Sequence, residues 1–216
     1  MLWDMDGTLV NTEPLWMAAE TELVESFGAA WTHDRALELV GNGLIGSARI
    51  LQSAGVRMGE QEIIRWLTDH VKAHLDPRSM PWRPGARELL VALREAGVAT
   101  ALVTMSYRDM ALEIAGQLGF TGFDAVIAGD DVAHEKPHPE PYLRGAEAIG
   151  LPIGDCVALE DSVIGLGSAV AAGAATVAIP FILEIPDSPD YVKWDSLVGR
   201  GVDDVVAVLE SRSPVR

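Results

Sequence analysis

The sequence contains 216 residues, 49% of them hydrophobic, and carries a net charge of −16 at pH 7. This length and composition are typical of a globular protein with one good core and room for a second small domain. The acidic charge argues against a surface for nucleic acid or anionic membrane, because both partners need clustered Lys and Arg. An anionic substrate would need a local cation, such as a divalent metal, to offset the field of the protein itself.

Cys156 is the only cysteine, which excludes an intramolecular disulfide and predicts a reducing, cytoplasmic compartment. No secretory signal is visible, since Asp4 and Asp6 interrupt the N-terminus where an apolar segment would be needed. The oligomeric state is not indicated by the sequence.

The chain opens with a short apolar run that ends in Asp4 and Asp6, two like charges on either side of one methionine. Taken alone, the pair indicates a turn, since Asp and Gly both favour turns. The alternative is a pair of carboxylates that holds a cation at the end of a strand. Only three residues precede Asp4, so we expect a short first strand, and whether the natural chain extends upstream of Met1 stays open.

Residues 15–80 next show helical patterns with no convincing strand between them. These patterns cover 14–27, 34–40, 47–54 and 60–75. We therefore predict an all-helical cap domain over 15–81, inserted into an α/β catalytic core made of 1–14 and 82–216.

From residue 84 onward, helical and strand-like patterns alternate. The helical patterns cover 84–96, 107–118, 140–149 and 162–172, and the strand-like runs cover 98–104, 124–128, 155–160 and 174–179. Such alternation predicts βαβ units and a mostly parallel sheet that is buried on both faces. The predicted fold class is α/β, a Rossmann-like three-layer α/β/α sandwich with a parallel sheet plus the inserted all-helical cap domain.

Residues 162–183 carry no charge over 22 positions, which is long enough for a membrane span. Several glycines and Pro180 interrupt the stretch, its first half is rich in Ala and Gly, and its second half contains β-branched residues. We interpret it as a buried helix followed by a buried strand, with a membrane span as the alternative.

Polar side chains follow four of the predicted strands. They are Asp4 and Asp6, Thr104 and Ser106, Lys136, and Glu160 with Asp161. In open parallel sheets, ligands bind beyond the carboxyl ends of the strands. We therefore expect these residues to converge on one site.

The residue types of this set suit phosphoryl transfer. A carboxylate can attack phosphorus and form an acyl phosphate. A hard cation such as Mg²⁺ prefers oxygen ligands and would hold Asp4, Asp161 and the phosphate together. Lys136 and the Thr104 hydroxyl can hold the transferring oxygens. Asp6 would protonate the leaving oxygen and later deprotonate water.

Four motifs in this order resemble those of the haloacid dehalogenase superfamily of phosphohydrolases, in the branch with a helical cap after the first strand. They are "DMDGTLVNTEP" (4–14), "LVTMS" (102–106), "EKPHPEPY" (135–142) and "LEDSVIG" (159–165). The resemblance runs nearly from end to end. It implies Mg²⁺-dependent hydrolysis of a small phosphorylated metabolite through a phospho-aspartyl intermediate.

The resemblance also implies a role for each matching residue. Asp4 is then the nucleophile, Asp6 the general acid/base, Thr104 the phosphate-binding hydroxyl and Lys136 the motif lysine. The implied metal ligands are Asp4, Asp6 through its backbone carbonyl, Asp161, and Glu160 beside it. The implied phosphate- and substrate-binding residues are Met105, Ser106 and, in the cap, Gly43 and Arg49.

Three positions depart from the motifs of the superfamily. Asn11 stands where relatives often carry Asp, and Met105 stands where Asn or Ser is commoner. The backbone N–H of Met105 is still available to a phosphate. Glu135 precedes Lys136 where Gly is usual, which adds a negative charge near an anion site. We expect its side chain to point to solvent.

Two further patterns suggest other sites. The segment "GNGLIG" (41–46) has the spacing of a dinucleotide fingerprint, but it follows a helical pattern and not a strand. We interpret it as a flexible cap loop that faces the substrate. His70 and His74 have zinc-like spacing, yet no third ligand suggests itself, so a solvated helix face is favoured.

Several alternative functions fit parts of the sequence. Phosphoryl transfer of the β-phosphoglucomutase type stays open, because such mutases share all four motifs, although the first cap loop has no lysine. A dehalogenase is disfavoured by Asp6, and a phosphonate hydrolase by the late position of Lys72 in the cap. A receiver-like module or a non-enzymatic Mg²⁺-binding relative are the alternatives outside enzymes. The sequence does not indicate which metabolite is the substrate.

Overall fold

The computed structural model describes residues 1–211, and its centre is a six-stranded parallel sheet in the order β3-β2-β1-β4-β5-β6. The strands are β1 (Leu2–Trp3), β2 (Ala101–Val103), β3 (Ala125–Ile127), β4 (Val157–Glu160), β5 (Ala175–Ala178) and β6 (Val192–Lys193). Every residue of β1, β2, β4 and β5 is buried, as expected of parallel strands that are covered on both faces.

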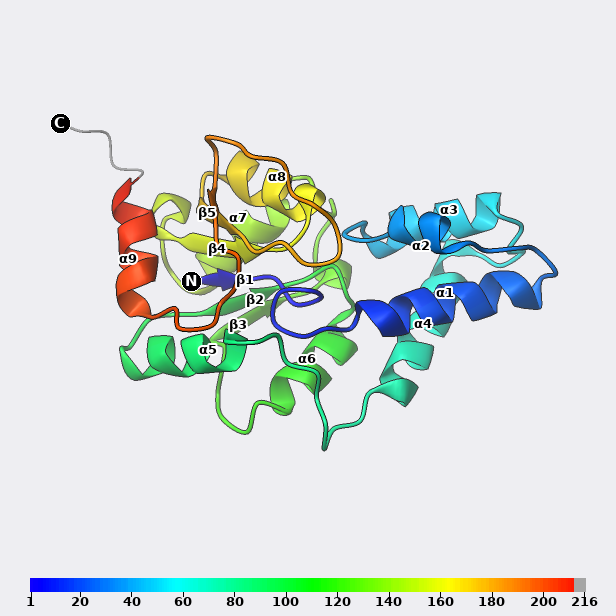
Figure 1. The fold of residues 1–216 in the computed structure, drawn as a ribbon, viewed down its shortest axis with the longest axis horizontal. Helices are drawn as coiled ribbons and strands as arrows, with labels where there is room; N and C mark the ends of the chain where they lie inside the picture. Colours follow the sequence, from blue (N-terminus) through cyan, green and yellow to red (C-terminus); the bar gives the residue numbers. More distant parts are fainter. Residues whose placement is uncertain (212–216) are drawn as a thin grey trace.

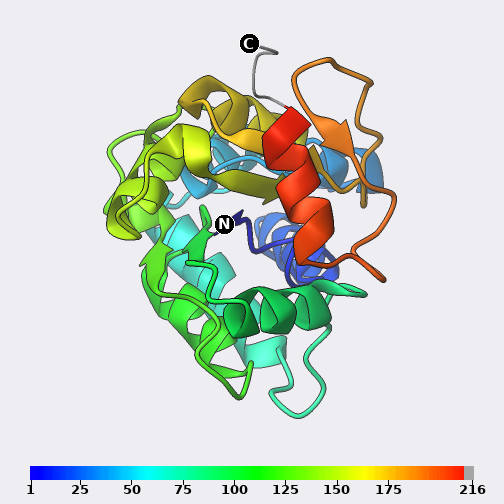
Figure 2. The ribbon, with the colours of Figure 1, turned by 90° about the vertical axis from the view of Figure 1, so that its left-hand side faces the viewer.

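Helices cover both faces of this sheet (Figure 2). They are α5 (Ala86–Glu95), α6 (Arg108–Gly116), α7 (Glu140–Ala148), α8 (Val163–Ala172) and α9 (Val202–Ser211), with the short 3-10 helices η1 (Gly129–Asp131) and η2 (Ile153–Asp155). Successive strand residues point to opposite faces. Leu2 accordingly packs with Tyr142 of α7, and Trp3 packs in a separate cluster with Leu89 of α5. The predicted three-layer α/β/α sandwich is confirmed.

Four helices form an insert between β1 and α5, to one side of the sheet (Figure 1). They are α1 (Glu13–Ser26), α2 (His33–Leu37), α3 (Leu44–Ser53) and α4 (Glu60–His74). We call residues 13–74 the helical insert. The side chains of Leu51, Ile63 and Leu67 are fully or almost fully buried in it, so the insert has an apolar interior. The predicted boundaries of a cap domain, 15–81, stay a prediction.

The two chain segments that connect the insert to the sheet run side by side. Val10 pairs with Trp82 in an antiparallel bridge. The backbone N–H of Asn11 donates to the carbonyl of Pro81 (2.8 Å), and that of Arg83 donates to the carbonyl of Leu9 (2.9 Å). The chain therefore enters and leaves the insert at adjacent points.

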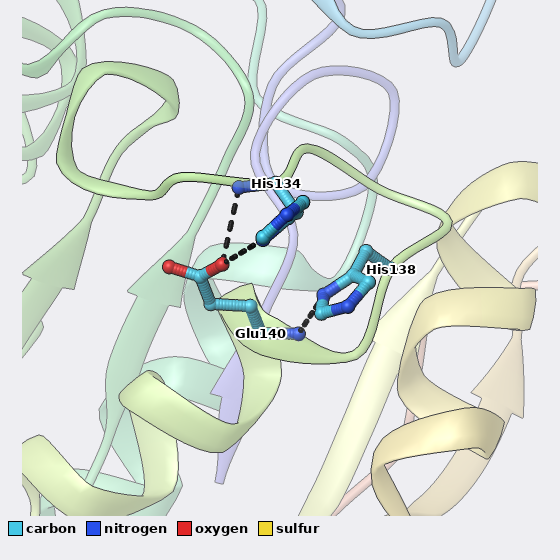
Figure 3. Close-up of side chains that lie close together, drawn as sticks. All are labelled: His134, His138 and Glu140. Carbon is cyan, nitrogen blue, oxygen red and sulfur yellow. Dashed lines mark hydrogen bonds and ion pairs between the residues drawn. The ribbon is translucent and has the colours of Figure 1, made fainter.

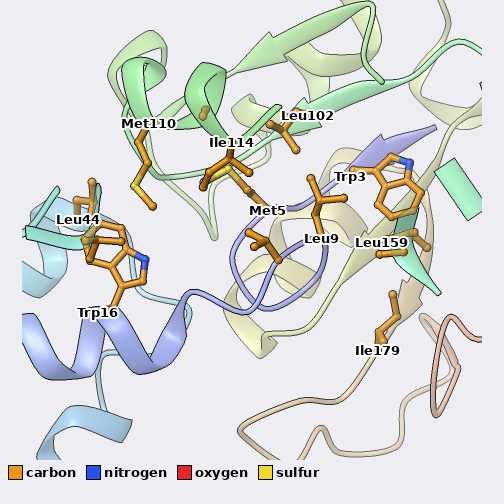
Figure 4. Packing of buried hydrophobic residues seen from close by; sticks show 14 of the residues in the cluster. Trp3, Met5, Leu9, Trp16, Leu44, Leu102, Met110, Ile114, Leu159 and Ile179 are labelled. Carbon is orange, nitrogen blue, oxygen red and sulfur yellow. The ribbon is translucent and has the colours of Figure 1, made fainter. Parts of the chain in front are cut away.

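The turn after β1 is anchored by apolar side chains (Figure 4). Met5 and Leu9 are fully buried in the same cluster as Trp3. Because side chains alternate along an extended segment, Asp4 points away from this cluster, toward the edge of the sheet where the strands end. Packing of the apolar residues thus fixes where the carboxylates lie.

The uncharged stretch 162–183 divides as the sequence analysis predicts. It contains α8 and β5, separated by Gly173, whose φ of +94° ends the helix. Within residues 1–211, no helix is long and apolar enough to cross a membrane. The structure adds β6 and α9, two elements that the sequence patterns did not predict.

Candidate active site

A cavity of about 70 Å³ lies between the carboxyl ends of the strands and the helical insert. The residues that line it from the α/β part are Asp4, Asp6, Thr104, Met105, Ser106, Lys136, Asp161 and Ser162. The insert lines the other side, mainly through α1 and residues 39–47. The structure therefore brings together polar residues that follow four different strands.

Lys136 connects two carboxylates at the bottom of this site. Its Nζ lies 2.8 Å from Asp4 Oδ1 and 2.7 Å from Glu160 Oε1, and it also donates to the carbonyl of Val103 (2.9 Å). The Lys136 side chain is only 3% exposed. Tyr142 donates a further hydrogen bond to Glu160 Oε1 (2.6 Å). All three ammonium protons thus have acceptors, which fixes the lysine in place.

Burial sets the electrostatics of these groups. It raises the pKa of Asp4 to about 7, helped by the negative charge of Glu160 and opposed by Lys136. Burial alone would lower the pKa of Lys136, but the charges of Asp4 and Glu160 outweigh it and raise this pKa. The pKa of Asp161 is raised well above its usual range, by burial first and then by Asp4. One ammonium therefore faces three buried carboxyls, and the site is short of positive charge.

Four donors hold the carboxylate of Asp6. Its Oδ1 accepts from the hydroxyl of Thr12 (2.5 Å) and from the indole N–H of Trp16 (3.1 Å). Its Oδ2 accepts from the hydroxyls of Ser106 (2.7 Å) and Thr104 (3.3 Å). These donors come from the first turn of α1 and from the end of β2, so Asp6 is oriented by both sides of the cavity.

Three carboxylates of this site form a group of oxygen ligands that could bind a hard cation. Oxygens of Asp4, Glu160 and Asp161 lie within 4.8 Å of one another. Both oxygens of Glu160 already accept hydrogen bonds, from Lys136, Tyr142 and Ser162. Asp4 Oδ2, in contrast, is buried with no hydrogen-bond partner among the described residues. Asp4 and Asp161 are thus the carboxylates left for Mg²⁺, which prefers oxygen ligands.

Gly7 makes room for one of these carboxylates. Its φ is +82°, and a Cβ at this position would lie 1.9 Å from Asp161 Oδ2. The glycine of the first motif is therefore required for the close approach between the turn after β1 and the residue after β4.

The remaining predicted site residues lie in different surroundings. Met105 is almost buried, and its sulfur accepts from the backbone N–H of Lys136 (3.3 Å). Gly43 begins α3 without lining the cavity. The structure does not bring Arg49 to the cavity either: its side chain is 66% exposed and pairs with Glu60 at 2.9 Å.

The expectation that Glu135 points to solvent is wrong. Its Oε1 accepts from the backbone N–H of Ile45 (3.2 Å) at the start of α3. The carboxylate caps this helix, whose first N–H groups have no acceptor within the helix. Gly43 permits the contact, because a Cβ there would lie 2.3 Å from Glu135 Oε2. The segment 41–46 thus contacts the loop that carries Lys136, and no strand precedes it. The prediction of a cap loop over all of 41–46 is wrong, because residues 44–46 form the first turn of α3.

A second group of possible metal ligands lies beside this loop (Figure 3). His134 Nδ1 is 2.8 Å from Glu140 Oε2, and the rings of His134 and His138 are stacked. The Glu140 carboxylate also accepts from the backbone N–H groups of Ala133 and His134. The Glu140 carboxylate thus holds the loop at residues 133 and 134, and His138 Nδ1 accepts from the backbone N–H of Glu140 (3.2 Å), the first residue of α7. His70 and His74 likewise stack on each other, and within the described chain they belong to no group of three metal ligands.

The sequence analysis missed two carboxyl groups of the cavity. Glu13 and Glu20 of α1 line it together with Trp16 and Met17. Their spacing of three, four and seven residues places them on one helix face. This spacing was visible in the sequence, but it did not show that this face of α1 lines the cavity.

A model of the family described as haloacid dehalogenase-like hydrolase matches residues 1–179. Over 198 residues the chain is 28% identical to hexitol phosphatase B of Escherichia coli strain K12, covering 90% of this chain and 88% of that protein. It is 30% identical over 216 residues to the chloroplastic protein SUPPRESSOR OF QUENCHING 1 of Arabidopsis thaliana, which covers 95% of this chain but 20% of that longer protein. The crystal structure of CbbY from Rhodobacter sphaeroides in complex with phosphate matches with a TM-score of 0.84 and 28% identity, covering 95% of this chain and 97% of that one. With the family match extending over residues 1–179, this chain belongs to the haloacid dehalogenase-like hydrolases.

Proposed function

We propose that the protein hydrolyses a small phosphomonoester, a sugar phosphate or similar metabolite, with Mg²⁺ and through a phospho-aspartyl intermediate on Asp4. The observation that carries the proposal is the buried Asp4 carboxylate in the cavity that also contains Asp6. Lys136 holds its Oδ1, and its Oδ2 has no hydrogen-bond partner within residues 1–211. The similarity to a protein named hexitol phosphatase B supports the same chemistry.

The proposed reaction has two steps. A carboxylate oxygen of Asp4 attacks phosphorus, the bond from phosphorus to the leaving oxygen breaks, and Asp6 gives that oxygen a proton. Water then attacks phosphorus and gives a proton to Asp6 while the bond from phosphorus to Asp4 breaks. Inorganic phosphate leaves, and both aspartates return to their starting states.

Lys136 and Thr104 contribute to this reaction by contacting the two aspartates, Asp4 and Asp6. The Lys136 ammonium opposes the rise in the pKa of Asp4 that burial causes, and it places a positive charge beside the nucleophile. Thr104 and Ser106 hold Asp6 on its Oδ2 side. When bound at Asp4 and Asp161, Mg²⁺ would neutralise charge on the phosphate and on the carboxylates.

We also propose that the helical insert acts as a cap over the cavity. An engineered cavity of about 150 Å³ holds one benzene molecule. The cavity of about 70 Å³ is smaller than that, so a sugar phosphate enters only if the insert moves away from the sheet. A cytoplasmic location stays a prediction of the sequence.

The test is phosphate release from a panel of sugar phosphates, phosphoglycolate, nucleotides and p-nitrophenyl phosphate. Each compound is assayed with Mg²⁺ or EDTA, for the wild type, for Asp4→Asn, and for the control Asp155→Asn at an exposed position. Release that requires Mg²⁺, disappears in Asp4→Asn and persists in the control is the expected result.

Two outcomes contradict the proposal. Release that persists in Asp4→Asn would rule out Asp4 as the nucleophile. If a folded wild type releases no phosphate from any compound of the panel, hydrolysis of these esters is ruled out. If it interconverts glucose phosphates without releasing phosphate, the enzyme is a mutase and not a hydrolase.

A further inference from the structure

We propose that the cavity selects phosphomonoesters whose leaving group is uncharged and rich in hydroxyls, and that it rejects leaving groups with a second phosphate or a carboxylate. The inference rests on the proposed phosphatase activity and names its substrate class. It is carried by two buried carboxyl groups of α1, Glu13 and Glu20, which we call the acidic wall.

The acidic wall faces the site where the leaving group of a phosphomonoester would lie. Asp4 and Lys136 line the sheet side of the cavity, and Glu13 and Glu20 line the side of the insert. Glu13 is 7% exposed and Glu20 is 5% exposed. Neither carboxyl is therefore a solvated surface group, and both border the cavity between the insert and the sheet.

One oxygen of Glu20 lacks a hydrogen-bond partner among the described residues. This atom, Oε2, is buried. Buried polar atoms in native proteins are nearly always hydrogen-bonded, so such an exception calls for a partner. A hydroxyl of the ligand can donate to a carboxylate oxygen or accept from a protonated carboxyl, so it satisfies Glu20 in either state.

A second anion would find no counter-charge in this cavity. Among the described residues that line it, Lys136 is the one with a cationic side chain. Its ammonium is already used by Asp4, Glu160 and the carbonyl of Val103. Burying a further anion without a partner is strongly unfavourable. Charge therefore disfavours a leaving group with its own phosphate or carboxylate.

An uncharged polyol fits the remaining surface. Asn42 and Ser47 offer polar groups, and Trp16 and Leu44 offer apolar surface for its carbon skeleton. Burial raises the pKa of Glu13 to about 8 and that of Glu20 to about 9. Burial thus favours the neutral form of Glu20, which can donate to and accept from hydroxyls without attracting an amine.

The first test uses pairs of substrates that differ in one group. Glucitol 6-phosphate and 6-phosphogluconate have the same carbon chain, and only the second ends in a carboxylate. Fructose 6-phosphate and fructose 1,6-bisphosphate form a second pair. We expect kcat/KM of the wild type to be about 100-fold higher for the uncharged member of each pair, from the penalty on an unpaired buried charge.

The second test changes Glu20 alone. Glu20→Met keeps an unbranched side chain of similar length but removes both oxygens, whereas Glu20→Gln keeps an acceptor and a donor. The readout is the ratio of kcat/KM for glucitol 6-phosphate to that for p-nitrophenyl phosphate, whose leaving group has no further hydroxyls. We expect this ratio to fall about 3- to 10-fold in Glu20→Met, to recover in Glu20→Gln, and to stay unchanged in the exposed control Glu25→Gln of the same helix.

The outcomes separate the two proposals. If p-nitrophenyl phosphate and all sugar phosphates are inert, the phosphatase itself is refuted. If p-nitrophenyl phosphate is hydrolysed and both members of each pair react equally well, the substrate class is refuted and the phosphatase stands. Glucosamine 6-phosphate that reacts more than about tenfold faster than glucose 6-phosphate would show that the acidic wall binds a cation, which also overturns the proposal.

Discussion

The contact between Glu135 and α3 predicts how firmly the helical insert is held against the sheet. Glu135→Ala removes the acceptor for the N–H of Ile45 and leaves the start of α3 uncapped. The loss of such a cap costs about 1 kcal/mol. At 25 °C this free energy corresponds to about a fivefold change in the equilibrium constant, in favour of the arrangement in which α3 has moved away from the loop of Glu135.

Hydrogen exchange measures this shift directly. The amides of residues 44–46 should exchange about fivefold faster in Glu135→Ala than in the wild type. Burial raises the pKa of Glu135, although the backbone N–H groups of α3 oppose this effect. Glu135→Gln keeps an oxygen that can accept from the N–H of Ile45 but removes the negative charge at the start of α3, so its exchange rate should lie between those of the wild type and Glu135→Ala. Glu147→Ala, at an exposed position of α7, is the control.

A double-mutant cycle tests the same reasoning by steric means. The Cβ introduced by Gly43→Ala would meet the Glu135 carboxylate at 2.3 Å, so this variant should also loosen α3. In a Glu135→Ala background the obstacle is gone, and the same change should have almost no effect. Additive effects of the two substitutions, or wild-type exchange rates in Glu135→Ala, would refute the assigned contact.

Three further predictions follow from the buried charges. Burial raises the pKa of Glu20 from 4.5 to about 9. Between these two values the unfolded chain ionises at Glu20 while the folded protein does not, so the stability of the fold falls as the pH rises. Glu20→Gln should therefore raise the melting temperature at pH 8.5 but not at pH 4.5. Lys136→Met leaves two buried carboxylates without a counter-charge and should lower the free energy of unfolding by about 3–5 kcal/mol, as urea denaturation would measure. Mg²⁺ should raise the melting temperature of the wild type and not that of Asp161→Asn, and an equal rise in both would exclude this ligand.

The location of the candidate site was largely predictable from the sequence, because most of its residues follow strands that run in the same direction. Asp4, Thr104 and Asp161 each follow a strand, and parallel strands end at one edge of the sheet. Apolar runs identify such strands because both faces of the sheet are buried. Lys136 follows a longer loop after β3. The resemblance of the segment 135–142 to a motif of the superfamily, more than the apolar run before it, indicated that Lys136 reaches the same edge of the sheet.

The contacts of the insert were not predictable in this way. Helical periodicity shows that α1 has one face with Glu13 and Glu20, but it does not show that this face meets the cavity. The capping role of Glu135 depends on a contact with Ile45, 90 residues away in the chain. Arg49 is a similar case, since its pairing with Glu60 is decided by how two helices of the insert pack.

The adjacent entry and exit of the helical insert have a consequence for how such proteins diversify. Because Val10 and Trp82 are bridged, the α/β part could be closed by a short connection in place of the whole insert. The aspartates and Lys136 lie outside the exchanged segment. A lineage can therefore replace the insert, and with it one side of the cavity, while the two aspartates and Lys136 keep their positions.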